Sequence, residues 1–486
     1  MTTDQPTDPA GPTGQLSLWL ASLKLSDVPE SIKTRAKYLL LDGIGCALVG
    51  AHLPWSEKAA QVHFELEPVG GTCDVFGWEK KLTPLSAALV NATFIQGFEL
   101  DDWHSEAPLH SNAILIPSLF SAASVQGSTN TSPSGTKVTG ADFLLAYLAG
   151  LEVGPRVGNA LHGSHILSMG WHSGAVFGGS ASAAAVSKLF GLKAGAIEDA
   201  LGIACTQACG LMSAQFESEV KRMQHGFAAR NGLLAALLAK AGYVGIKRVY
   251  EREYGGFLDM FSKGMEREPR FLEGEVCRDL GGMWKTEGVR VKPYAAMAAT
   301  HGAVDCVRIL QEEYDELMGD LEGIESVVLR MGDVAFHHGG WKAERPLSSV
   351  GAQMSAAYVA VTQMVDREVM PRQFRSDMLE RDDVWRLVDK VTCVQDSGLE
   401  GSLGATEANV TWKNGREEKV AVANARGVDP ELSNEDVVEK WRGLMKGVID
   451  DEMRVKIEET CLGIEELDDV MVLGTLLAGM SRNVIA

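Results

Sequence analysis

The chain has 486 residues, of which 65 are acidic and 45 basic, and its formal net charge at pH 7 is -20. This charge argues against nucleic acid or an anionic membrane as the main partner, and it requires a local basic cluster if the substrate is an anion. Hydrophobic residues make up 45% and charged residues 23%, as in ordinary globular proteins. The chain is longer than the size at which a single hydrophobic core usually stops growing, so we expect two domains.

The beginning of the chain carries no recognisable targeting signal. Residues 1–14 are acidic and proline-rich, which predicts a disordered tail, and the first lysine is Lys24. No apolar run approaches the roughly 20 residues that a membrane span needs. The eight cysteines are scattered, without a second pair at metal-binding spacing, which favours reduced thiols. We therefore expect a cytoplasmic protein that does not enter a membrane.

Apolar residues recur at intervals of three and four between residues 15 and 286, a pattern typical of helices. Thr139 before Asp142 resembles a capping signal. The stretch 126–140 is rich in small polar residues and predicts a surface loop. The helical segments are residues 31–51, 140–163, 180–192, 197–215 and 226–243.

The pattern changes near Gly288, where strand-like segments begin. Residues 407–422 predict a hairpin with Asn414-Gly415 at its turn. The other expected strands are residues 288–296, 324–332 and 388–396. We expect a mainly α fold with an inserted α+β domain: a helical domain over 15–286, a lid over 287–427, and C-terminal helices over 428–486 that return to the helical domain. Clefts between such domains are favoured ligand sites.

Residues 99–111 read ELDDWHSEAPLHS and combine acids, histidines and a tryptophan. Pro108 stops a helix from continuing through this stretch, so polar side chains can converge from a helix end and a loop. The candidates are Asp101, Asp102, His104 and His110. A solvated turn with a capping aspartate is one interpretation, and a metal-dependent hydrolase is another. His-x5-His, however, matches no familiar metal spacing.

Two further segments carry titratable side chains in the helical part of the chain. His172 precedes a run of small residues that begins a helix, where it is either a cap or a site residue. Lys221 and His225 are four residues apart and share a face if their segment is helical. Lysines are mostly exposed, but the apolar flanks of this segment favour a basic cluster at a site.

A third segment lies at the expected domain junction. Lys292 and Tyr294 point to the same side of a predicted strand, and His301 follows. A lysine in this position can close over a ligand that the helical domain holds.

These segments resemble the MmgE/PrpD family, which includes 2-methylcitrate dehydratases and cis-aconitate decarboxylases. The resemblance is carried by ELDDWHSEAPLHS, GWHSGAV, EDALGIACTQACGLMSAQ, VKRMQHGFAARNGLL and YGGFL, and it covers nearly the whole chain. PWSEK and HSEAPLHS resemble the decarboxylase branch in particular. The resemblance implies a homodimer, a small tricarboxylate substrate, and decarboxylation of cis-aconitate to itaconate without metal or organic cofactor. Dehydration of 2-methylcitrate stays the alternative.

The resemblance also assigns residues by motif. It implies catalytic roles for His110, His172, Lys221 and Lys292 and for an aspartate that is Asp101 or Asp102, of which we take Asp102 as catalytic. From the segments themselves we expect substrate contacts for Asp101, His104, His225, Tyr294 and His301. The chain departs from the family pattern at Ala295 and Ala296, where relatives often have cysteine, and in GGWKAERPLSS, where no lid tyrosine is evident.

These residue types can support a decarboxylation. Loss of CO2 from the saturated carbon of cis-aconitate leaves a dienolate, so cations must hold the retained carboxylates and an acid must protonate carbon. The lysines suit the first task and His110 or His172 the second. We favour His110, because neighbouring aspartates favour its protonated form, with His172 orienting the substrate. A non-catalytic tricarboxylate-binding protein is a third interpretation.

Overall fold

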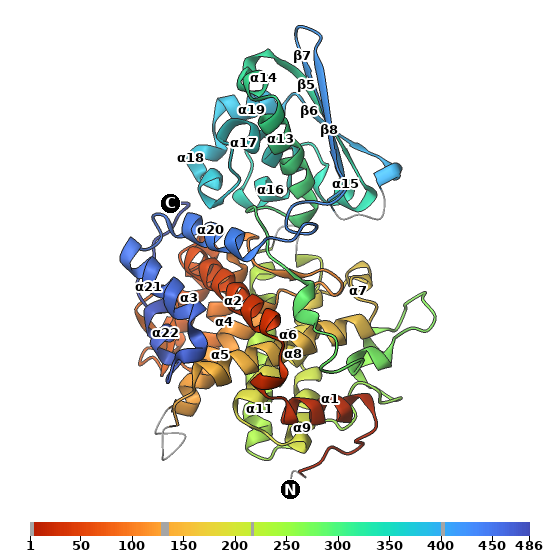
Figure 1. The fold of residues 1–486 in the computed structure, drawn as a ribbon, viewed down its shortest axis with the longest axis vertical. Coiled ribbons are helices and arrows are strands. Elements are labelled where there is room, and N and C mark those ends of the chain that lie inside the picture. Colours follow the sequence, from red (N-terminus) through yellow and green to blue (C-terminus); the bar gives the residue numbers. More distant parts are fainter. Residues whose placement is uncertain (1–3, 128–135, 215–217, 400–403) are drawn as a thin grey trace. The chain divides into compact units, whose positions relative to one another are not determined.

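The computed structural model describes residues 4–127, 136–214, 218–399 and 404–486 (Figure 1). The chain forms two compact units, which are described separately. Unit 1 comprises Met1–Gly97, Asp101–Val289 and Val437–Arg482, and unit 2 comprises Phe98–Leu100, Arg290–Asp436 and Asn483–Ala486. The short segment Phe98–Leu100 belongs to unit 2. The expected domain limits of 15–286, 287–427 and 428–486 place it in the helical domain instead.

Unit 1 is helical, and its most buried helix is α8 (Ser173–Leu189). α8 packs against α6 (Gly140–Ala160) and α11 (Gln224–Lys240), and its alanine, glycine and serine side chains let these helices approach closely. The other α-helices that the structure describes in this part of the chain are α1 (Pro12–Ser22), α2 (Glu30–Gly50), α3 (Pro54–Leu66), α4 (Pro84–Ile95), α5 (Ser111–Gly127), α7 (His165–Ser168), α9 (Ala194–Cys205) and α12 (Phe257–Phe261). From the C-terminal part come α20 (Asn434–Met445), α21 (Asp451–Leu462) and α22 (Met471–Leu477).

Four of the five predicted helices are present with limited shifts at their ends, and the fifth, over 197–215, is shorter than predicted. Thr139 caps α6 as expected, because its hydroxyl accepts a hydrogen bond from the backbone N–H of Asp142 (3.1 Å). α9 ends at Cys205, well before residue 215. Gly210 in the following loop has a φ of +106°, a value that is incompatible with a right-handed α-helix. The expected loop at 126–140 falls largely outside the described residues, and α5 reaches Gly127.

The chain before α1 differs from the expected disordered tail where it is described, from residue 4 onward. The backbone N–H and hydroxyl of Thr7 donate to Glu198 on α9 (2.9 and 3.0 Å), which fixes this segment to the unit. Within the described ranges, no single helix is long and apolar enough to cross a membrane; only α2 and α3 taken together pass such a test, and they are bent by 83°.

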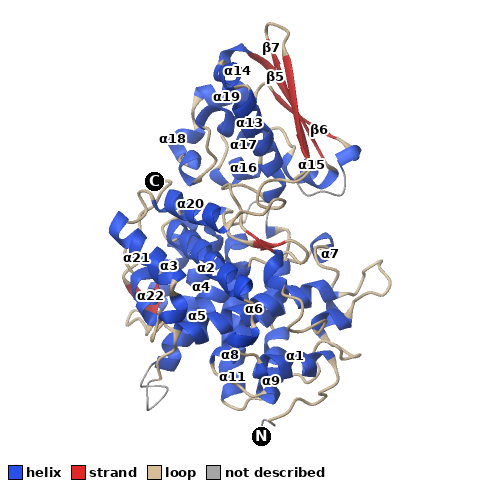
Figure 2. Ribbon diagram, viewed as in Figure 1, coloured by secondary structure: helices blue, strands red, loops and turns tan. Residues whose placement is uncertain are grey.

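Unit 2 contains a four-stranded sheet in the order β6-β5-β7-β8. β5 (Ile324–Met331) pairs parallel with β6 (Val391–Gln395) and antiparallel with β7 (Thr406–Trp412), which forms the predicted hairpin with β8 (Glu417–Val422). Helices cover one face of this sheet (Figure 2). α13 (His301–Glu313), α15 (Asp333–Gly339) and α17 (Ala356–Asp366) contact the strands. The other described helices of this unit pack against these helices or against one another: α14 (Asp315–Gly319), α16 (Ser349–Met354), α18 (Ser376–Leu379) and α19 (Asp382–Val388). A mainly α fold with a smaller α+β part is thereby confirmed.

The predicted strand over 288–296 is wrong beyond its first residues. β4 is only Val289–Arg290, and Pro293, which has no N–H to donate, follows shortly after it. Lys292 and Tyr294 therefore lie in an irregular segment and not on one side of a strand. The remaining short strands are β1 (Cys73–Val75), β2 (Lys80–Leu82) and β3 (Trp103–His104).

Candidate active site: a cluster of three histidines

Three imidazole rings meet inside unit 1. The ring centroid of His225 lies 4.9 Å from that of His110 and 4.9 Å from that of His172, with nearly perpendicular planes in both pairs (80° and 77°). His110 directly precedes α5, His172 is the N-cap of α8, and His225 is the second residue of α11. Three separate helix starts thus bring together residues that are more than 50 positions apart in the sequence.

His110 is the most accessible ring of the cluster, and a buried aspartate holds it. Asp101 Oδ2 lies 2.9 Å from His110 Nδ1; the aspartate side chain is 1% exposed and the histidine side chain 21%. His172 and His225 are buried. This contact fixes the orientation of the His110 ring.

Asp102 serves the start of α5. Its two carboxylate oxygens accept hydrogen bonds from the backbone N–H groups of Ser111 and Asn112, each at 3.0 Å. Burial, followed by the charge of Asp101, raises the pKa of Asp102 well above its usual value. Because both oxygens are engaged, the geometry favours a positioning role for Asp102 over the expected catalytic one: it anchors the helix that follows His110.

His104 is likewise bound by the backbone around it. Its Nδ1 accepts from the N–H groups of Glu106 and Ala107 (3.2 and 3.1 Å), and its Nε2 donates to the Lys285 carbonyl (3.0 Å). This network assigns the tautomer and uses both ring nitrogens. The geometry therefore favours a structural role for His104 over substrate contact or metal ligation.

Two glycines let the histidine cluster form. A Cβ atom on Gly174 of α8 would lie 2.0 Å from His225 Nε2. A Cβ on Gly210 would lie 2.7 Å from Gln224 Oε1, and the amide of Gln224 bonds both the N–H and the carbonyl of Leu211 (2.9 and 3.2 Å). Any side chain at Gly174 would thus displace the central ring of the cluster.

Lys221 lies just before α11, in the short 3-10 helix Glu219–Met223, and is half-buried. The expected α-helical face shared with His225 is therefore interrupted, because α11 begins only at Gln224. The next residue, Arg222, is buried and donates to the Gln96 carbonyl (3.4 Å).

In unit 2, Lys292 is buried and its ammonium nitrogen lies 3.1 Å from Glu99 Oε2. Glu99 lies in the same unit, on Phe98–Leu100. Glu99 opens the stretch ELDDWHSEAPLHS, but it is not among the residues predicted for the site, because nothing in the sequence reveals that its charge is buried.

Tyr294 and His301 have partners within unit 2. The Tyr294 hydroxyl donates to Asp305 Oδ1 (2.5 Å), and His301 Nε2 donates to the Ala296 carbonyl (2.9 Å). Burial and the charge of Asp305 raise the pKa of Tyr294. These bonds favour packing roles over the substrate contacts expected for both residues.

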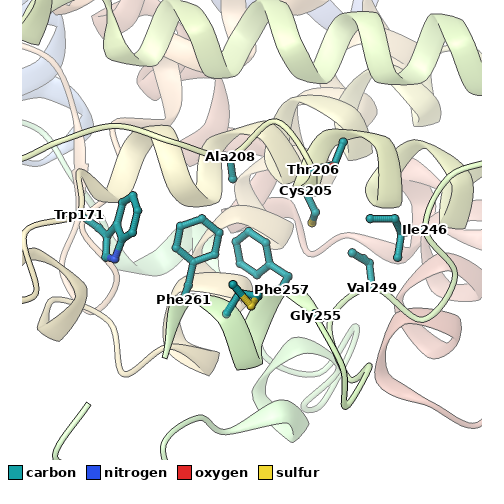
Figure 3. Close-up of a pocket in the computed structure, with 11 residues that line it drawn as sticks. Trp171, Cys205, Thr206, Ala208, Ile246, Val249, Gly255, Phe257 and Phe261 are labelled. Carbon is teal, nitrogen blue, oxygen red and sulfur yellow. The ribbon is translucent and has the colours of Figure 1, made fainter. Parts of the chain in front are cut away.

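A separate pocket of about 280 Å³ opens in unit 1 beside Trp171, Phe257 and Phe261 (Figure 3). Its described lining is largely apolar, and none of the expected site residues belongs to it. An apolar lining offers no compensation for the charges of the tricarboxylate that the resemblance implies, so the histidine cluster is the better candidate for the active site.

Comparison with known proteins assigns the chain to a family. The MmgE/PrpD N-terminal domain matches residues 14–270, and the MmgE/PrpD C-terminal domain matches residues 294–464. The chain belongs to the MmgE/PrpD family. The resemblance inferred from the motifs is thereby confirmed.

Relatives align over almost the whole chain. The cis-aconitate decarboxylase-like protein oryM of Aspergillus oryzae is 46% identical, covering 99% of this chain and 100% of its own. A cis-aconitate decarboxylase of Aspergillus terreus is 46% identical over 96% of each chain. A cis-aconitate decarboxylase of Homo sapiens is 26% identical over 96% of this chain and 94% of its own. The similarity therefore includes both units.

Proposed function

We propose that this MmgE/PrpD protein is a carboxy-lyase that converts cis-aconitate to itaconate and CO2. Similarity over nearly the full length to cis-aconitate decarboxylases (46% and 26% identical) and to a cis-aconitate decarboxylase-like protein (46% identical) supports the reaction. The structural observation that carries the proposal is the Asp101–His110 pair packed beside His225 and His172, because it offers an oriented proton donor at a histidine cluster.

The proposed reaction begins with cleavage of the bond between the saturated carbon of cis-aconitate and its carboxylate. CO2 departs, and the electron pair moves through the alkene toward the carboxylate at the other end, giving a dienolate. A proton added to the former alkene CH carbon yields itaconate. Two carboxylates are retained, and we assign Lys221 and Lys292 as the cations that hold them and stabilise the developing charge.

We assign His110 as the acid that delivers this proton. The Asp101 carboxylate stabilises the imidazolium, and the ring is more exposed than its two neighbours. His172 and His225, which pack against each other, then orient the substrate. The homodimer, the lack of a cofactor and the cytoplasmic location stay predictions.

The proposal is tested by incubating purified protein with cis-aconitate in the presence of a chelator and following itaconate by NMR. Wild-type protein should release CO2 and itaconate in equal amounts. His110→Gln should lower kcat by about 10²–10⁴-fold, the usual contribution of a general acid, and leave KM largely unchanged. A matched control is His337→Gln, which alters an exposed histidine of α15 and should keep full activity.

Other outcomes separate the alternatives. Elimination of water from 2-methylcitrate without CO2 release from cis-aconitate would make the protein a dehydratase. Activity that disappears with the chelator and returns with metal would favour the hydrolase interpretation. Full activity of His110→Gln would remove His110 from the mechanism but not the reaction itself.

A further inference from the structure

Glu99 and Lys292 form an ion pair in the interior of unit 2. Their side chains are 6% and 3% exposed, and Nζ and Oε2 are 3.1 Å apart. Within the described ranges, Glu99 is the one carboxylate that pairs with Lys292. An ammonium has three N–H donors, so this pair leaves donor capacity for an anionic ligand.

The backbone holds Glu99 in an unusual conformation. Its φ is +55°, in the left-handed region that a side chain other than glycine seldom adopts. A residue keeps such a backbone conformation where the contacts around it hold it in place, and such residues are frequent at functional sites. A conformational cost at the residue that carries the carboxylate indicates that the position of this carboxylate matters.

Neighbouring groups fix the segment on which Glu99 lies. The side-chain amide of Gln353 donates to the carbonyls of Phe98 and Ala295 (2.8 and 2.9 Å), tying Phe98–Leu100 to the segment that contains Lys292. The Phe98 ring also packs edge-on against Phe374, with centroids 5.9 Å apart. The carboxylate is therefore presented from a rigid support.

We propose that Glu99 is a positioning residue, which holds the ammonium of Lys292 in the place where it meets a substrate carboxylate. A lysine side chain is long and flexible, so a buried partner is needed to fix its charged end. The inference rests on the proposed function, because it takes Lys292 as a substrate cation. Glu99 itself is not expected to touch the substrate, since a carboxylate would repel it.

A double-mutant cycle distinguishes this role from simple stabilisation. Glu99→Gln should raise KM about tenfold, with a smaller change in kcat, and Lys292→Gln should have a larger effect. If Glu99 acts through Lys292, adding Glu99→Gln to Lys292→Gln should change kcat/KM by less than about twofold. A purely structural Glu99 would instead lower Tm while leaving KM of the folded protein unchanged.

Glu407→Gln provides the matched control. Glu407 lies on β7 of the same unit and pairs with a lysine, Lys419, at 2.8 Å, but that lysine is 59% exposed. This variant should keep the wild-type KM and kcat. Should Glu99→Gln fail to fold, Glu99→Asp enters the same cycle, since it keeps the charge with a shorter reach and should give an intermediate KM.

The outcomes separate the inference from the function on which it rests. Wild-type protein that releases no CO2 from cis-aconitate would overturn both. An active wild type in which the effects of Glu99→Gln and Lys292→Gln simply multiply would overturn the positioning role alone. Loss of the Glu99 effect in the Lys292→Gln background would support it.

Discussion

Asp101 and Asp102 are chemically identical neighbours with different tasks. Asp101 pairs with the imidazole of His110, whereas Asp102 binds the backbone at the start of α5. The motif could indicate an important aspartate at this place but not which of the two it was, because consecutive side chains diverge and only the fold decides what each one meets. In the proposed mechanism, the Asp101 carboxylate has the more direct effect on chemistry, because it pairs with the proposed proton donor His110.

Replacing Asp101 by asparagine removes the negative charge beside His110 and keeps the size of the side chain. We expect kcat to fall by about 10- to 100-fold, a part of what a general acid supplies, because the imidazolium loses its stabilising partner. Steady-state kinetics and thermal melting measure the effect. Asp74→Asn, which breaks an ion pair with Lys81 elsewhere in unit 1, should leave kcat unchanged. Equal kcat values for both variants would contradict the role of Asp101.

The small side chains of α8 allow the close helix packing that brings the site histidines together. Its alanine, glycine and serine side chains pack against α6 and α11, so the starts of α8 and α11, with His172 and His225, come close together. The sequence predicted this helix from its periodicity. It did not predict the contact between Gly174 and the His225 ring, because periodicity gives the face of a helix and not its distance from a neighbour.

Gly174→Ala tests whether this distance matters for catalysis. The new Cβ would lie 2.0 Å from His225 Nε2, so the ring must move, and we expect kcat to fall at least about tenfold while the fold remains. Gly179→Ala is the control on the same helix: its Cβ would lie 3.6 Å from the nearest atom, the Ala204 carbonyl oxygen. That variant should keep its activity and gain up to about 1 kcal/mol of stability, since alanine favours helices.

For the whole molecule, the sequence predicted the helical part, the hairpin and the change from helix-like to strand-like patterns near residue 288. Each of these depends on local periodicity or on turn residues. It did not predict that Phe98–Leu100 belongs to unit 2. Three residues carry no periodic pattern, and their assignment depends on long-range contacts such as the Gln353 amide on the Phe98 carbonyl. The predicted strand around Lys292 is wrong for a related reason. It rests on local alternation of residues, whereas the conformation of this segment depends on tertiary contacts.

The net charge of -20 has a consequence for a substrate that carries three carboxylates. Long-range repulsion slows the approach of such an anion, and added salt screens this repulsion. The Debye length falls from about 30 Å at 0.01 M salt to about 10 Å at 0.1 M. The proposed contact between a substrate carboxylate and the buried ammonium of Lys292 would be screened much less, so the local attraction would persist while the long-range repulsion weakens.

We therefore expect kcat/KM for cis-aconitate to rise by about two- to tenfold between 0.01 and 0.1 M NaCl. Salt slows the association of oppositely charged partners, and here it should speed association because it screens a repulsion. Initial rates at subsaturating substrate measure the change, and sucrose at equal osmolality should reproduce none of it. A value of kcat/KM that falls steadily from the lowest salt would mean that attraction dominates even at long range. In that case the acidic residues would be distributed away from the route by which the substrate enters, and the basic groups of the site would steer it from a distance.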